Sequence, residues 1–158
     1  MRLEYFQMVD RILALSIEQG HVRAAATVPT ESPVFEGHFP DYPIMPGVLL
    51  IECMAQTAGW ILLAQARFDR MPFLAAVKNA KLRNFVQPGT RLEIDARVLH
   101  EGSGFAVTRN EVLVEGTQVC SAEITFRILP FPASGVRDML LAAAKRVEFP
   151  LEAIGHGQ

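Results

Sequence analysis

Residues 47–66, GVLLIECMAQTAGWILLAQA, form a long apolar segment near the middle of this 158-residue chain. The segment follows Pro46, and proline is favoured in the first turn of a helix. Apolar residues occupy nearly every face of the predicted helix, so it belongs inside a protein rather than on its surface. Four polar residues, each costly in lipid, argue against a membrane span: Glu52, Gln56, Thr57 and Gln65. We therefore predict a buried central helix.

The segments around this helix have the patterns of β-strands. RLEIDARV (91–98) alternates polar and apolar residues, as a half-buried strand does. Two further strands are predicted in 104–129, separated by a turn at 115–117. An N-terminal hairpin is predicted from 9–16 and 21–28, and one more strand from 73–86.

An antiparallel sheet can bury one face against a helix. We therefore predict an α+β fold, with one domain over residues 1–158 and an antiparallel sheet wrapped around the long central helix. Residues 134–148, SGVRDMLLAAAKRVE, predict an extra C-terminal helix capped by Ser134, within an extension over 130–150. Its apolar side is formed by Val136, Met139, Leu140, Ala143 and Val147. Such a helix packs on the body of the domain or on a partner.

Composition narrows the classes of function. With 15 basic and 17 acidic residues the formal charge is −2, which supplies no general field for holding nucleic acid. Cys53 and Cys120 lie in apolar segments and form no CxxC pair, which favours free thiols in a reducing cytoplasm. Charges at Glu4, Asp10 and Arg11 break up the N-terminal segment before a signal-peptide core could form. We predict a cytoplasmic protein without a membrane span.

The loop before the central helix and the first turns of the helix contain the candidate catalytic residues. Prolines before and after His38 stiffen the loop that carries it. Glu52 lies about 7.5 Å along the helix axis from Gly47, and Gln56 lies one turn further on the same stripe. Glu52 and Gln56 can therefore touch.

These side chains suit general acid–base catalysis. A carboxyl group in a dry core stays protonated unless it is paired, so Glu52 is a candidate proton donor. A neutral histidine is a base, so His38 is its counterpart. The helix start at Gly47 offers unpaired N–H groups to developing negative charge. The combination suits proton abstraction beside a carbonyl and departure of a β-hydroxyl, which is dehydration of a β-hydroxyacyl compound.

A purely structural interpretation stays open, in which Glu52 bonds only to Gln56 or to loop amides. The remaining histidines, His21, His100 and His156, are assigned structural or surface roles. The chain has no GxSxG elbow, no GxxxxGK[ST] loop and no HExxH helix, and no cofactor or metal is implied.

The stretch GHFPDYPIMPGVLLIECMAQ (37–56) resembles the signature of the β-hydroxyacyl-acyl-carrier-protein dehydratases, the FabZ and FabA group of hotdog-fold enzymes. The resemblance implies conversion of (3R)-hydroxyacyl thioesters to trans-2-enoyl thioesters in fatty acid biosynthesis. It implies that His38 is the base at the α-carbon and Glu52 the acid for the leaving hydroxyl. It further implies that the Gly47 amide binds the thioester carbonyl and that Gln56 supports Glu52.

The resemblance also bears on assembly and specificity. It implies a homodimer whose two sites each combine His38 of one subunit with Glu52 of the other, and it leaves a free dimer and a trimer of dimers open. The isomerising branch of the family usually carries aspartate at the position of Glu52, so little isomerase activity is expected. The segment LEYFQMVDRI (3–12) and the C-terminal tail resemble a subgroup that serves the very long acyl chains of lipid A.

The partner that the resemblance implies is an acyl carrier protein with a phosphopantetheine-linked substrate. Acyl carriers are acidic, so Lys78, Lys81 and Arg83 are candidates for the contact. The family frequently has an acidic residue where this chain has Lys78, and a charged strand edge explains the three equally well.

Two other functions are compatible with the same fold. One is a hotdog acyl-thioesterase, which would direct water at the thioester carbon. The other is a non-catalytic module that binds acyl chains. The presence of both His38 and Glu52 favours the dehydratase.

Overall fold

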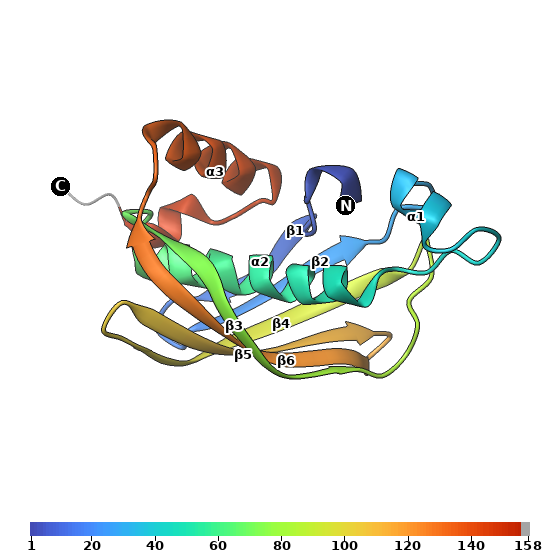
Figure 1. Cartoon of the computed structure of the whole chain (residues 1–158). Coiled ribbons are helices and arrows are strands. Elements are labelled where there is room, and N and C mark those ends of the chain that lie inside the picture. The colour runs from blue at the N-terminus through green and yellow to red at the C-terminus, as the bar shows by residue number, and fades with distance from the viewer. Residues whose placement is uncertain (156–158) are drawn as a thin grey trace.

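The computed structural model of the chain describes residues 1–155, so His156 lies outside the described part. A six-stranded antiparallel sheet curls around one long helix, α2 (Gly47–Gln65), as Figure 1 shows. The strand order is β1-β2-β4-β5-β6-β3. The strands are β1 Arg11–Ser16, β2 His21–Thr27, β3 Arg70–Leu82, β4 Arg91–Gly102, β5 Phe105–Val114 and β6 Thr117–Pro130. This architecture confirms the α+β hotdog fold predicted from the sequence.

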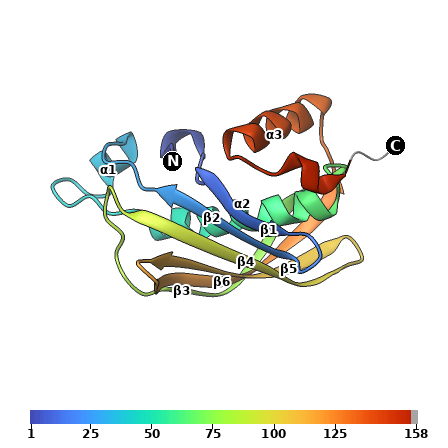
Figure 2. The same ribbon diagram turned by 180° about the vertical axis from the view of Figure 1, so that it is seen from behind.

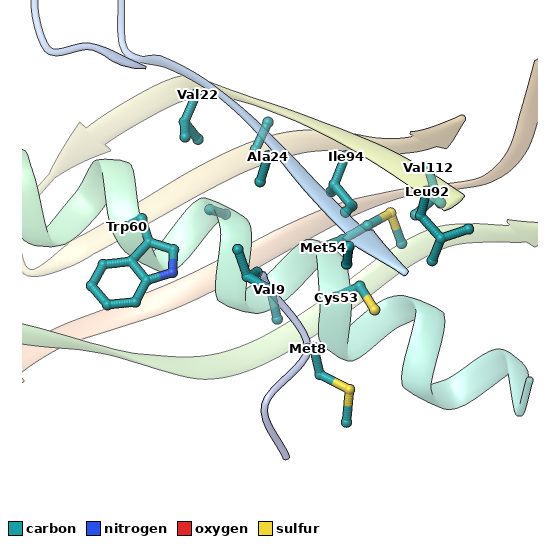
Figure 3. Close-up of a cluster of buried hydrophobic side chains, with 14 of the residues drawn as sticks. Met8, Val9, Val22, Ala24, Cys53, Met54, Trp60, Leu92, Ile94 and Val112 are labelled. Atoms are coloured by element: carbon teal, nitrogen blue, oxygen red, sulfur yellow. The ribbon is translucent and has the colours of Figure 1, made fainter. Parts of the chain in front are cut away.

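Helix α2 is the centre of the core. Met54 and Cys53 are fully buried, and strand side chains such as Ile94 and Val112 lie around the helix (Figure 3). By length and composition alone α2 could cross a membrane, but most of its apolar segment is buried inside the domain. No second helix within residues 1–155 has that length and apolarity. The prediction of a buried central helix is confirmed.

Tight two-residue turns connect β4 to β5 and β5 to β6. Ser103 and Gly104 have φ values of 55° and 78°, and Glu115 and Gly116 have 49° and 78°. Two consecutive residues with positive φ fit the right-handed twist of a two-residue hairpin. The turn predicted at 115–117 is therefore confirmed, and β4, β5 and β6 form a meander.

Strand β3 differs from its predicted range of 73–86, because it starts at Arg70 and ends at Leu82. The Arg83 N–H still donates to the Val119 carbonyl of β6, and the residues beyond it leave the sheet edge. They support the loop before α2, where the Met45 N–H donates to the Val86 carbonyl at 2.7 Å. The strand pairs only with β6, so its other edge is unpaired within the described chain.

A third layer covers α2 on the side away from the sheet. It consists of η1 (Leu3–Tyr5), α1 (Pro33–Gly37), α3 (Ser134–Arg146) and η2 (Leu151–Ile154), and both Figure 1 and Figure 2 show η1 and α3 beyond α2. Helix α3 runs antiparallel to α2. Its first turn is fixed where Arg137 Nε donates to the Phe68 carbonyl at 2.9 Å, and beyond its end Phe149 packs against Trp60.

The predicted C-terminal helix is present, but its predicted cap is wrong. Ser134 is the first helical residue, and the cap position is Ala133, whose side chain cannot accept a hydrogen bond. The extended backbone of Ala133 still sets the start of the helix, which the side-chain pattern does not reveal. Of the predicted apolar side, Val147 is buried, whereas Met139 is 58% exposed.

Candidate active site

Glu52 and Gln56 are in contact on α2, as their spacing predicts. Gln56 Nε2 donates to Glu52 Oε1 at 2.9 Å and to the Phe6 carbonyl at 2.7 Å. Its Oε1 accepts from the Met8 N–H at 3.2 Å. The acceptor at Phe6 and the donor at Met8 fix which end of the carboxamide is nitrogen. Gln56 therefore orients one oxygen of Glu52 and leaves Oε2 free to react.

The sequence does not reveal that the N-terminal segment holds Gln56. The segment is 48 or more residues away, and both of its contacts use backbone atoms of Phe6 and Met8. Backbone groups carry no residue-type signal, so no motif marks them.

Glu52 is half-buried rather than enclosed in a dry core, because it lines an open groove of about 650 Å³. The walls of the groove come from α2, β3, α3 and residues 5–7. Most of the groove-lining side chains are apolar, and Glu52 and Gln56 are among the polar ones. A carboxyl group at one position of an apolar groove is a common arrangement of binding and catalytic sites.

His38 occupies the loop between α1 and α2, with its ring held in one orientation. Its Nδ1 lies 3.0 Å from the Ile44 carbonyl, and a carbonyl can only accept, so Nδ1 carries the hydrogen. In the neutral ring Nε2 then has the lone pair and can act as a base. The Phe39 ring stacks on the imidazole at a centroid distance of 4.2 Å, and reciprocal backbone bonds between Phe39 and Tyr42 brace the loop.

His38 does not line the groove that contains Glu52. Within one chain the structure thus brings Glu52 and Gln56 together and leaves the imidazole outside their cavity.

Gly47 is the first residue of α2, and the Leu82 side chain lies directly over it. A Cβ at position 47 would collide with a Leu82 methyl group, so only glycine fits without movement of that side chain. Leu49 and Leu50 donate to the Pro46 carbonyl, so within residues 1–155 only the N–H groups of Gly47 and Val48 in this turn have no acceptor. The start of α2 therefore presents these two donors next to the Leu82 side chain.

The three basic residues predicted to meet a carrier protein are exposed but do not share one site. Lys81 and Arg83 line a polar hollow of about 500 Å³ on the outer face of the sheet, and Lys78 does not. Acidic side chains alternate with the basic ones in this hollow, among them Asp95, Glu111 and Glu123. The local charge is mixed rather than uniformly positive.

The two cysteines and the histidines His21 and His100 lie outside the candidate site. Burial raises the pKa of the Cys53 thiol, to which the neighbouring Glu52 contributes, and burial raises the pKa of Cys120 to about 11. His21 pairs with Asp95 at 2.6 Å, and His100 is exposed on β4. Among residues 1–155 no three His, Cys, Asp or Glu side chains are close enough to hold a metal ion.

Comparison with known proteins shows the family of this chain. A sequence model described as the FabA-like domain matches residues 2–123, which is more than half of the chain. The chain belongs to the FabA-like family. The matched part of this FabA-like chain includes α2, the His38 loop and strands β1 to β5, and it ends before α3.

Curated relatives of this FabA-like protein are named 3-hydroxyacyl-[acyl-carrier-protein] dehydratase FabZ. The protein from Shewanella frigidimarina is 35% identical over 123 residues, which are 75% of this chain and 80% of the relative. The protein from Listeria monocytogenes is 35% identical over 129 residues, which are 80% of this chain and 88% of the relative.

Solved structures share the fold of this FabA-like chain at low sequence identity. A dehydratase heterocomplex from Xenorhabdus doucetiae has a TM-score of 0.65 at 18% identity, covering 85% of this chain and 90% of the other. A thioesterase-like protein from Ralstonia eutropha has a TM-score of 0.60 at 18% identity, covering 73% and 82%. Because dehydratases and thioesterases both appear here, the likeness concerns the fold alone.

Proposed function

We propose that this protein is a (3R)-hydroxyacyl-[acyl-carrier-protein] dehydratase that forms trans-2-enoyl thioesters in fatty acid biosynthesis. The observation that carries the proposal is the oriented Glu52 carboxyl in an apolar groove, in a FabA-like chain. The FabZ names of the curated relatives support the same reaction.

In the proposed mechanism, His38 Nε2 removes a proton from the α-carbon while the β-hydroxyl departs. The C–H electrons become the new C=C bond, and the C–O electrons leave with the hydroxyl, which takes a proton from Glu52 Oε2 and becomes water. Negative charge that develops on the thioester oxygen is stabilised by the Gly47 N–H at the start of α2. The carboxylate left on Glu52 accepts the hydrogen bond that Gln56 donates.

The proposal includes a homodimer that joins His38 of one subunit to Glu52 of the other. The absence of His38 from the groove of Glu52 supports this shared site. The unpaired edge of β3 can pair with a second copy, and exposed apolar side chains lie beside it. Phe85 is 75% exposed and Val48, on the first turn of α2, is 71% exposed. Mass in solution distinguishes a free dimer from a trimer of dimers.

The finer features of the substrate are also proposals. The carrier protein would approach Lys78, Lys81 and Arg83 from the solvent side of the sheet, where its acidic side chains meet these exposed basic ones. The very long acyl chains of lipid A are the proposed specialised substrate, and the cytoplasm is the proposed compartment. Glu52, rather than aspartate, supports dehydration with little isomerisation.

The decisive experiment is hydration of a trans-enoyl thioester, followed by loss of enoyl absorbance. The unaltered protein, His38→Ala and Glu52→Gln are measured in parallel, with folding checked by circular dichroism. We expect each variant to lose about 100-fold or more in turnover, because general acid–base groups contribute ~10²–10⁴-fold. Turnover unaffected in both variants would refute the assigned roles.

Product analysis separates the competing functions. A dehydratase run on a β-hydroxyacyl thioester releases the trans-2-enoyl thioester, a thioesterase releases free acid and thiol, and a binding module releases neither. Substantial cis-3-enoyl product would instead show that isomerisation accompanies dehydration.

A further inference from the structure

The groove that contains Glu52 continues along α2 well beyond the carboxyl group. Its floor is one stripe of the helix, formed by Glu52, Gln56, Gly59 and Leu63. These positions follow the helical repeat, and Glu52 and Leu63 are about 16 Å apart along the axis. The groove volume of about 650 Å³ is within the usual range of small-molecule sites. A long ligand can therefore lie on α2 with its reactive end at Glu52.

Gly59 gives the floor its depth. Glycine is among the poorest helix formers, and Gly59 lies in the interior of a 19-residue core helix. Packing does not require a glycine there, because an added Cβ would have only Pro72 Cγ nearby, at an ordinary 3.9 Å. The missing side chain instead leaves open space over the middle of the floor.

Helix α3 forms the wall opposite this floor. Met139, Leu140 and Ala143 line the groove from α3, and Met71 and Leu74 line it from β3. The bond from Arg137 to the Phe68 carbonyl fixes the first turn of α3, and the last turn is held where Arg146 Nη1 donates to the Val9 carbonyl at 3.4 Å. Figure 1 shows α3 lying over the C-terminal half of α2. The wall is thus attached to the body at both ends.

We propose that α3 is the outer wall of an acyl-chain site, and that Gly59 and Met139 determine how long a chain the enzyme accepts. The occupant is the unbranched long acyl chain of a thioester whose α- and β-carbons lie at Glu52. This inference rests on the proposed dehydratase function and adds its specificity determinants. The FabA-like match ends at residue 123, so this wall belongs to a part of the chain outside the matched domain.

The kinetic test compares two substrates that differ only in chain length, the pantetheine thioesters of crotonate and of trans-2-hexadecenoate. Gly59→Leu adds a side chain that fills the open space over the floor of the groove. Met139→Trp adds a larger side chain that narrows the groove from α3. For each variant we expect kcat/KM for the hexadecenoyl substrate to fall about 10-fold or more. For the crotonyl substrate kcat/KM should fall by a smaller factor, so the ratio of the two kcat/KM values is the quantity that the test compares.

Asp138→Trp is the matched control, because Asp138 is exposed on α3 and does not line the groove. It places the same indole on the outward side of the same helix and should leave both substrates unaffected. If Met139→Trp and Asp138→Trp have the same profile, or if both chain lengths decline equally in Met139→Trp and Gly59→Leu, the proposal is wrong.

A binding measurement keeps this inference separate from the proposed reaction. Trp60 is the only tryptophan of the chain and lines the groove, so its fluorescence reports occupancy of the site. S-hexadecyl-pantetheine, a thioether that cannot react, should shift the emission of the unaltered protein, and S-butyl-pantetheine should not at the same concentration. A shift without any enoyl hydration would overturn the proposed reaction and leave the acyl site intact. Equal responses to the two thioethers would overturn the acyl site itself.

Discussion

The carboxamide of Gln56 connects the N-terminal segment to the candidate acid. It donates to the Phe6 carbonyl and to Glu52 and accepts from the Met8 N–H, so every polar group of the side chain has a partner. A side chain satisfied in this way has one orientation, and the carboxyl group beside it has a fixed neighbour.

We expect Gln56→Ala to reduce kcat with little change in KM. A hydrogen bond to a charged group contributes ~1.5–3 kcal/mol, so the loss corresponds to about 10- to 100-fold in rate. Steady-state hydration kinetics measure the effect. Gln118→Ala is the matched control, because Gln118 donates to Glu111 at 2.6 Å on the outer face of the sheet. Equal kinetics in the two variants would show that Gln56 has no part in positioning Glu52.

The Cys120 thiol links stability to alkaline pH. Burial raises its pKa from 9.0 to about 11, so the folded protein keeps the thiol neutral where the unfolded chain ionises it. This contribution to stability is fully present below pH ~9 and is lost as the pH rises towards ~11. Urea unfolding at pH 8 and pH 10 should show a smaller decline in Cys120→Ala than in the unaltered protein. An identical decline in both would exclude the thiol as the cause.

The sequence predicts side-chain contacts within one helix, where the two residues are close along the chain. The Glu52–Gln56 pair follows from helical spacing, and its hydrogen bond is present. The support of Gln56 from Phe6 and Met8 could not be predicted, because it depends on where tertiary packing places two backbone groups. The bond of His38 to the Ile44 carbonyl also escapes prediction, because a backbone carbonyl in a loop has no residue-type signal.

Among the elements, α2 contributes most of the core, since it is covered by the sheet on one side and by α3 and η1 on the other. The side chains of its buried faces pack against five strands, β2 to β6. Removal of one such side chain leaves a cavity that the surrounding sheet cannot fill.

We expect Met54→Ala to lower the free energy of unfolding by ~2–5 kcal/mol, as large-to-small substitutions in cores do. Met54 is completely buried, whereas Leu99 on β4 is 45% exposed. Leu99→Ala should therefore change the free energy of unfolding by no more than ~0.5 kcal/mol. Chemical denaturation of both variants measures the difference. Equal costs at the two positions would contradict the central place of α2 in the core.

The sequence predicts which helices and strands are present, but it predicts their first and last residues less well. Periodicity and apolar content identify α2, α3 and the strands, because burial imposes those patterns. The end of β3 at Leu82 depends instead on the bond between Met45 and Val86, which are 41 positions apart. The start of α3 depends on the extended backbone of Ala133 rather than on a capping side chain.

One chain leaves His38 outside the groove of Glu52, so the proposed homodimer can be tested by mixing variants. His38→Ala and Glu52→Gln are each inactive as homodimers in this scheme. A mixed dimer has one site with both residues intact and one site with neither.

We expect equal amounts of the two variants, mixed under conditions that exchange subunits, to recover about a quarter of the unaltered activity. Half of the dimers are then mixed, and each has one of two sites restored. The measurement is enoyl hydration before and after exchange, with dimer mass checked by light scattering. Two portions of the same variant, exchanged together, are the control. Recovery of no activity in dimers shown to have exchanged would place His38 and Glu52 of the same chain in one site.

The positions of the strands along the chain have a consequence for the synthesis of the protein. Helix α2 is complete at Gln65, but β4, β5 and β6, which cover it, end only at Pro130. At ~5–20 residues per second, a ribosome needs roughly 3 to 13 s to make the intervening segment. For that interval the growing chain has a long apolar helix and only the β1–β2 hairpin available to cover it. We therefore expect a ribosome-bound chaperone to bind this nascent chain most strongly just after α2 emerges, when the apolar surface of the helix is most exposed.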